Sequence, residues 1–227
     1  GYVLLEGEVV VDKEAKAPVV VAAPALLGEM LQFNPRAQRT ATVCARGRAT
    51  ALKFPWEEFY AQAKLCLSET EKDLLLESIE RSVWERFGSE TIIDLALFNG
   101  LPDVLKLRAC LALQWIVQHR TLADGELLFA QDDLCGAIGY VVVQGAIRLV
   151  KTNYPPRIVD APDVIGVMPR FDPGLQWSAT ATAQGDAHLL RFSWQEFTAT
   201  LQRRLTPQEY ALFTQVIDAN APAHFVH

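Results

Sequence analysis

The sequence predicts a mainly β fold with flanking α-helices, in which two jelly-roll-like β-barrels are joined by helices. Three observations predict it. One stretch of sequence occurs twice, each copy divides into short strands separated by glycine and proline, and capping signals mark helices between and after the copies. With 227 residues, about half of them hydrophobic, the chain is long enough to bury two such cores.

The repeat begins at the first residue. Gly1-Tyr2-Val3 recurs as Gly139-Tyr140-Val141, an offset of 138 residues, and about two in five positions up to Phe59 are identical at this offset without a gap. Other identical pairs are glycines, prolines and aromatic residues: Gly7 and Gly145, Pro24 and Pro162, Gly28 and Gly166, Trp56 and Trp194. An unforced match of this length indicates a tandem duplication.

Strands are expected where β-branched and alternating apolar residues lie between turn residues. These stretches are residues 2–11, 19–22, 40–45 and 50–54 of the first copy and 140–150 of the second. Each copy is expected to close with a helix that starts near its tryptophan. Short strands with helical flanks are typical of a small barrel or roll.

Helices are predicted outside the two copies. Ser68 with Glu71, and Thr206 with Glu209, form the capping-box pattern that starts a helix. Residues 97–113 are expected to be helical, and residues 122–130 to form a turn and a strand before the second copy.

The sequence therefore predicts a partial first domain at residues 1–67, a helical linker at 68–96, a complete second domain at 97–205 and a C-terminal helix and tail at 206–227. The tail after Ala219 is expected to fray. No counterpart of residues 97–138 precedes Gly1, so we expect either that the chain is a fragment of a longer protein or that its first barrel is unusual.

Composition narrows the classes of function. A formal charge of -6 and a pI near 5.3 oppose general binding to nucleic acid or to anionic membrane surfaces. The four cysteines have no CxxC spacing, which is typical of reduced thiols, and no apolar run reaches the length of a membrane span. A cytoplasmic protein is expected.

The segment from Gly28 to Arg39 has the chemistry of an anion site. A glycine followed by a short helix would direct backbone N–H groups at a phosphate. The guanidinium of Arg39 can grip two phosphate oxygens, and the acceptor-only carboxylate of Glu29 suits a ribose hydroxyl.

This segment resembles the phosphate-binding cassette of the cyclic nucleotide-binding domain family. Gly28-Glu29 and Arg39-Thr40-Ala41-Thr42-Val43 meet its Gly-Glu and Arg-(Ser/Thr/Ala)-Ala-Thr-Val pattern. The resemblance implies that cAMP or cGMP is the ligand, with no other cofactor and no metal. It also implies that Glu29 binds the ribose 2′-hydroxyl, Arg39 the cyclic phosphate and the amides near Gly28 the rest of the phosphate. The implied ligand-binding residues are Gly28, Glu29, Met30, Arg39, Thr40 and Ala41.

Two details refine the resemblance. Family members that prefer cGMP often carry Arg-Thr-Ala, so Thr40 hints at a bond to the guanine amino group. The second copy resembles the family from its opening helix onward, but Val167 stands at the position of Glu29 and Trp177 at that of Arg39. Both charged contacts are therefore lost there, and Trp177 is expected to fill the pocket.

No enzyme chemistry is predicted. His119, His188, His224 and His227 do not cluster in sequence as metal ligands would, and no nucleophile motif occurs. The leading hypothesis is a regulatory sensor that binds a cyclic purine nucleotide in the first copy and relays it through helices to a partner. That partner is an effector protein such as a kinase, or a second copy of the chain.

Two alternatives stay open at the sequence level. Both copies could be interaction modules without a ligand, which Val167 and Trp177 favour for the second copy. A transcription regulator similar to the catabolite activator proteins ranks last, because the roughly thirty residues after Phe197 predict one helix and no helix-turn-helix.

Overall fold

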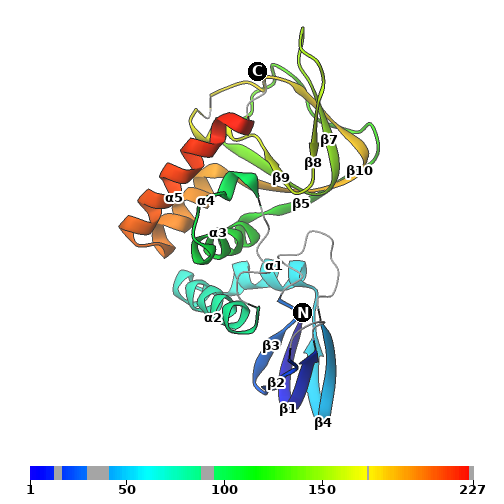
Figure 1. Cartoon of the computed structure of the whole chain (residues 1–227), viewed down its shortest axis with the longest axis vertical. Coiled ribbons are helices and arrows are strands. Elements are labelled where there is room, and N and C mark those ends of the chain that lie inside the picture. Colours follow the sequence, from blue (N-terminus) through cyan, green and yellow to red (C-terminus); the bar gives the residue numbers. More distant parts are fainter. Residues whose placement is uncertain (13–16, 30–40, 88–94, 173, 225–227) are drawn as a thin grey trace. The chain divides into compact units, whose positions relative to one another are not determined.

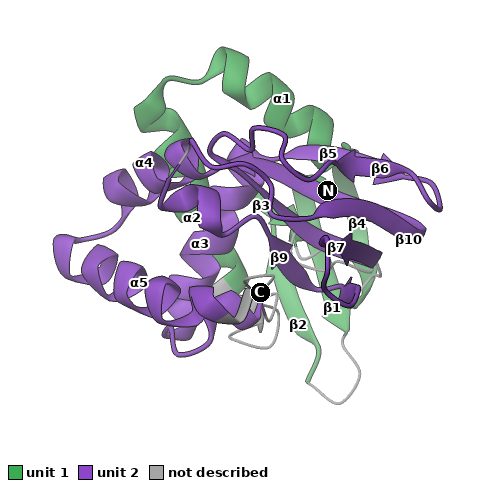
Figure 2. Cartoon of the chain, turned by 90° about the horizontal axis from the view of Figure 1, so that it is seen from above, with its two compact units in different colours: residues 1–92 green, residues 93–227 purple. Residues whose placement is uncertain are grey.

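A computed structural model describes residues 1–12, 17–29, 41–87, 95–172 and 174–224. The chain divides into two compact units, Gly1–Ile92 and Ile93–His227, which Figure 2 shows in different colours. Helices and strands contribute comparable shares (Figure 1), so the predicted mainly β composition is corrected to a mixed one. The long helices between and after the sheets account for the difference. The predicted domain boundaries stay predictions.

The first unit contains a sheet followed by two helices. Its elements are β1 (Tyr2–Asp12), β2 (Val19–Ala22), β3 (Ala25–Leu27), β4 (Thr42–Lys53), α1 (Trp56–Cys66) and α2 (Glu69–Phe87). Strand β1 is central: β2 pairs with one end, β3 with the other, and β4 runs antiparallel along the whole length.

Strand β4 corrects one expectation. Residues 40–45 and 50–54 were expected to be two strands, yet Thr42–Lys53 is continuous. The pairing of β1 with β4 shifts in register around Gly7, where φ is +82°. A Cβ at Gly7 would lie 2.2 Å from the Arg48 carbonyl oxygen, so only glycine allows the strands to cross this closely. The ladder therefore bends at this point without breaking.

The second unit has a larger sheet with helices before and after it. Its elements are η3 (Ala96–Phe98), α3 (Asp103–Ile116), β5 (Gln118–Leu122), β6 (Leu127–Phe129), β7 (Ile138–Val150), β8 (Arg157–Asp160), β9 (Asp163–Ile165), η4 (Met168–Arg170), β10 (Thr180–Ser193), α4 (Trp194–Arg204), α5 (Pro207–Asn220) and η5 (Ala221–His224). The antiparallel pair β7 and β10 forms its spine.

The β7–β10 spine bends in the same way as the β1–β4 pair. On one side of the bend β6 pairs with β10 and β8 with β7, and on the other side β5 pairs with β10 and β9 with β7. Jelly-roll-like barrels were predicted, but among the described residues the strands form two open sheets and no closed barrel. The sheet rolls at its bends, but no ladder joins its outermost strands.

The strand registers of the two units agree residue by residue. Glu8 pairs with Ala22, and 138 residues later Ala146 pairs with Asp160. Tyr2 pairs with Leu27, just as Tyr140 pairs with Ile165. In this register β1, β2, β3 and β4 correspond to β7, β8, β9 and β10.

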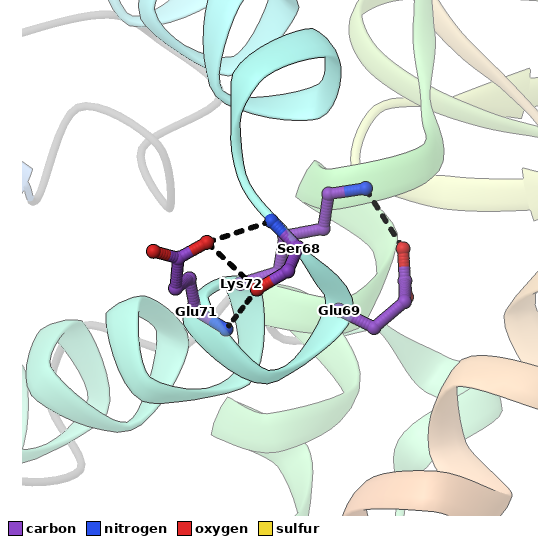
Figure 3. Close-up of polar contacts among 4 residues, drawn as sticks. All are labelled: Ser68, Glu69, Glu71 and Lys72. Carbon is purple, nitrogen blue, oxygen red and sulfur yellow. Dashed lines mark hydrogen bonds and ion pairs between the residues drawn. The ribbon is translucent and has the colours of Figure 1, made fainter.

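Both predicted capping boxes are confirmed. The Ser68 backbone N–H and hydroxyl donate to Glu71 Oε2 at 2.9 and 2.7 Å, and the Glu71 N–H donates back to Ser68 Oγ at 3.4 Å (Figure 3). The nearby Lys72 Nζ contacts Glu69 Oε1 at 2.8 Å. Thr206 and Glu209 make the reciprocal pair at the start of α5. These bonds satisfy N–H groups that the first turn of a helix leaves unpaired.

The predicted helix at residues 97–113 is wrong in its first part. The chain forms the short 3₁₀ helix η3, then turns at Gly100, where φ is +92°, and begins α3 only after Pro102. Proline pre-sets the backbone for a helix start, and glycine at positive φ ends the preceding turn. The tail expected to fray after Ala219 is helical in α5 up to Asn220 and then in η5.

Candidate functional site

The first candidate site begins at the end of β3. Gly28 follows Leu27 with φ of +79°, a conformation that glycine adopts without strain. Its carbonyl oxygen accepts a hydrogen bond from Trp56 Nε1, the first residue of α1, at 3.0 Å. The indole therefore fixes the backbone at the point where the predicted cassette begins.

Glu29 comes next and is completely buried. Its Oε1 accepts a hydrogen bond from Ser82 Oγ at 3.0 Å, and Ser82 lies on α2. A carboxylate is removed from water only when other groups bond to it, since the desolvation cost is large otherwise. The hydroxyl of Ser82 meets part of that need, and it is the same kind of group as the ribose hydroxyl predicted to bind Glu29.

Of the other four predicted ligand-binding residues, the structure describes one. Met30, Arg39 and Thr40 lie outside the described residues, so their roles stay predictions. Ala41 is half-buried and packs on the small sheet core of Leu4, Val9, Val11 and Leu27. Of the predicted set, the structure therefore describes Gly28, Glu29 and Ala41.

The equivalent place in the second unit starts identically. Gly166 follows β9 with φ of +80°, and its carbonyl oxygen accepts from Trp194 Nε1 at 2.7 Å. Val167 then takes the position that Glu29 holds in the first unit, and its side chain is 1% exposed. The same backbone frame therefore carries an apolar side chain in place of a carboxylate.

Trp177 occupies the space above Gly166. Its ring stacks on Phe129 with centroids 3.7 Å apart and planes inclined by 11°. A Cβ on Gly166 would lie 3.0 Å from Cη2 of Trp177, so the indole lies directly against this glycine. Trp177 is 9% exposed and therefore occupies part of the space beside the glycine at which this cassette begins.

A cavity of about 180 Å³ remains beside this ring. Its walls include both members of the aromatic stack and the short η4 segment, and Ser178 and Ala179 contribute from the chain before β10. The second unit therefore has space for a small molecule but lacks the charged groups of the predicted cassette.

Residues 119–204 match the family model described as the cyclic nucleotide-binding domain. This stretch, from β5 to the end of α4, is therefore similar to that family. The matched residues all belong to the second unit, in which the charged cassette contacts are replaced. No curated protein matches the sequence.

Solved structures give further matches. The Catabolite Activator Protein of Thermus thermophilus is 27% identical over 56% of this chain and 55% of its own, with a TM-score of 0.41. The regulatory domain of Toxoplasma gondii PKA, co-crystallised with cAMP, is 18% identical over 96% of this chain and 77% of its own, with a TM-score of 0.39. The regulatory subunit of a cAMP-independent protein kinase A from Trypanosoma brucei is 15% identical over 97% and 70%, with a TM-score of 0.45. This chain thus spans little more than half of the Thermus protein.

One contact between two histidines, outside the cassette, was not predicted from the sequence. His119 Nδ1 and His188 Nε2 lie 3.1 Å apart, because β5 and β10 are neighbours in the sheet. Residues 69 apart in sequence give no spacing signal, and only the strand pairing could have suggested the contact. Within the described ranges, no three His, Cys, Asp or Glu residues are grouped so that they could hold a metal ion.

Across the described part of the chain, no helix combines enough residues with enough apolar character to cross a membrane.

Proposed function

We propose that the first unit is a second cyclic nucleotide-binding domain and that it binds a cyclic purine nucleotide, cAMP or cGMP. The observation that carries this proposal is the buried carboxylate of Glu29, directly after a glycine whose backbone is held by Trp56. A buried, acceptor-only group at this place is chemically suited to a sugar hydroxyl. A loop that only connects two strands does not require a buried carboxylate.

The matching strand registers support the proposal for the first unit. The family model covers β7 to β10, and β1 to β4 repeat their pairing at a constant offset. The first copy also has Glu29, Arg39 and Thr40 at the positions where the second has Val167, Trp177 and Ser178.

In the proposed complex each predicted residue has one role. Glu29 accepts from the ribose hydroxyl, Arg39 grips two phosphate oxygens, and the backbone near Gly28 and Met30 donates to the phosphate. Ala41 supports the segment from the sheet core. The Thr40 hydroxyl is placed by the resemblance beside the purine, where it favours cGMP.

The relay follows from the contact between Glu29 and Ser82. In the described structure Ser82 of α2 donates to the carboxylate oxygen, and a ribose hydroxyl would compete for that carboxylate. Nucleotide binding then displaces Ser82 and removes a tie between α2 and the cassette. A ligand shifts such an equilibrium only by its different affinity for the two arrangements, and competition for one oxygen supplies that difference.

Calorimetry tests the proposal on the whole chain. Titration with cAMP and with cGMP should give binding heat for the wild type, and Arg39→Ala should weaken binding by about 100-fold, because a charge-assisted bidentate contact is lost. Arg36→Ala, in the same segment but outside the family pattern, is the matched control and should bind as the wild type does. No binding heat from the wild type with either nucleotide would overturn the proposal.

One observation favours a different function for the second unit. Val167 and Trp177 fill its cassette, so this unit suits a scaffold that contacts an effector such as a kinase, or a second copy of the chain, without binding a nucleotide. A melting temperature that does not change with any cyclic nucleotide, for the wild type and Arg39→Ala alike, would favour this reading for both units.

A further inference from the structure

The cavity of the second unit has apolar walls. It measures about 180 Å³, and its aliphatic lining comes from strands and loops far apart in sequence: Leu149, Val159, Val164, Ile165, Val167 and Leu175. Protein interiors are packed densely, and apolar cavities of this size hold water poorly because water finds too few hydrogen-bond partners there. An engineered apolar cavity of about 150 Å³ in another protein binds benzene. The space beside Trp177 is of the size of one substituted aromatic ring.

The wall is also suited to a ring. Phe129 and Trp177, which stack on each other, both line the cavity, so an added ring meets an aromatic surface either offset or edge-on. Met168 lines the cavity from η4 and is 40% exposed. Its flexible thioether makes favourable contacts with aromatic rings and can move aside to admit one.

The polar side chains of the wall are those of Cys135, Arg157, Gln176 and Ser178. Cys135 Sγ donates to the Leu175 carbonyl oxygen at 2.7 Å, and burial raises the pKa of this thiol, so it stays neutral. Arg157 is half-buried, is the one charged side chain in the described lining, and is already engaged in an interaction within the protein. The position that carries Arg39 in the first unit carries Trp177 here.

We propose that the second unit binds a small neutral aromatic molecule, of about one ring with short substituents, in the cavity bounded by Trp177, Phe129 and Met168. This site is separate from the nucleotide site of the first unit and does not depend on it. The two cassettes of the chain then bind ligands of different chemical classes.

The test uses ¹⁹F NMR of the whole chain with 4-fluorobenzyl alcohol as the probe. We expect line broadening that reports a dissociation constant on the order of 0.1 to 1 mM, which is typical for so few non-hydrogen atoms. Cyclohexylmethanol, of similar size but not aromatic, should compete at least 5-fold more weakly than unlabelled benzyl alcohol. Neither 4-fluorobenzoate nor cAMP should bind in this cavity.

Two variants test whether the probe binds in this cavity. Met168→Trp puts a larger side chain at a partly exposed wall position and should weaken binding at least 10-fold, while Ala179→Leu adds a larger side chain at a buried lining position and should abolish it. Phe171→Trp is the matched control, because it adds the same side chain three residues away at a half-exposed position outside the lining. A folded Met168→Trp protein that binds as the wild type does would overturn the proposal. So would a wild type that causes no broadening, or equal competition by cyclohexylmethanol.

Discussion

The two units hold their cassette glycines in the same way and then diverge at the next residue. Gly28 and Gly166 share positive φ and a carbonyl bonded to a tryptophan indole. After them the first unit buries Glu29 against Ser82, whereas the second buries Val167 beside the Trp177–Phe129 stack. The comparison teaches that the strand frame does not depend on the chemistry of its pocket. Each pocket can therefore be altered alone.

The largest effect is expected for Trp177→Ala. Its ring is 9% exposed, stacks on Phe129 and belongs to the main core of the second unit. Removing a buried tryptophan typically lowers the free energy of unfolding by about 3–5 kcal/mol. Denaturant unfolding measures this change, with the half-exposed Phe171→Ala as a control that should cost less than about 1 kcal/mol. An unchanged stability would show that the ring is not part of the core.

Glu29→Gln tests the proposed contact between the first unit and the ribose hydroxyl. The amide keeps an oxygen that can accept from Ser82 but removes the charge offered to the ribose hydroxyl. Nucleotide affinity should fall by about 10- to 100-fold, since a hydrogen bond to a charged group contributes about 1.5–3 kcal/mol. Calorimetry measures the loss, and Glu6→Gln, at an exposed position of β1, should have no effect.

Ser82→Ala should change affinity in the other direction. Without the hydroxyl, the carboxylate of Glu29 loses a bond that the free protein makes and the ligand must displace. Nucleotide binding should tighten by about 5- to 10-fold, as expected for removing one competing hydrogen bond of about 1 kcal/mol. Ser78→Ala, at an exposed position on the same helix, is the control. Weaker binding by Ser82→Ala would contradict the relay.

The smallest effects concern the two capping boxes. Thr206→Ala removes a side chain that accepts from Glu209 N, and should cost about 1 kcal/mol of stability. The backbone hydrogen bond from Thr206 lowers the pKa of Glu209 despite partial burial, and the hydrogen bond from the Ser68 side chain lowers that of Glu71.

A lowered pKa in the folded state means that each cap contributes stability above the usual carboxyl range and loses it as pH falls through the folded pKa. Melting temperatures between pH 7 and about pH 3 should therefore fall less steeply in Thr206→Ala than in the wild type. Parallel curves would contradict the cap's contribution to the pH dependence.

Sequence reasoning succeeded where one residue type fixes local geometry. The repeat at a constant offset predicted which strands correspond, and Ser68, Glu71, Thr206 and Glu209 predicted two helix starts. It failed where tertiary pairing overrides a local signal. Residues 40–45 and 50–54 were expected to be two strands, but pairing with β1 keeps β4 continuous. The apolar pattern of residues 97–113 predicted one helix, but Gly100 and Pro102 separate η3 from α3.

The candidate site shows the same division. Glu29 was identifiable from its pattern, but its partner Ser82 was not, because a serine in the middle of an amphipathic helix has no distinctive signal and the two are 53 residues apart. The contact between His119 and His188 likewise depends on which strands are neighbours. The cavity beside Trp177 depends on how side chains fill space, which no spacing rule describes.

Because the two sheets have the same register, the cassette segment of one unit can replace that of the other. Ala25–Leu27 and Asp163–Ile165 pair with the same positions of their central strands, and Thr42–Lys53 runs along β1 as the equivalent residues of β10 run along β7. The segment between them can therefore be transplanted from one unit to the other without inserting or deleting a residue. A chimaera in which both cassettes carry Glu29 and Arg39, or both carry Val167 and Trp177, is a minimal exchange, and the chain provides both the donor and the recipient.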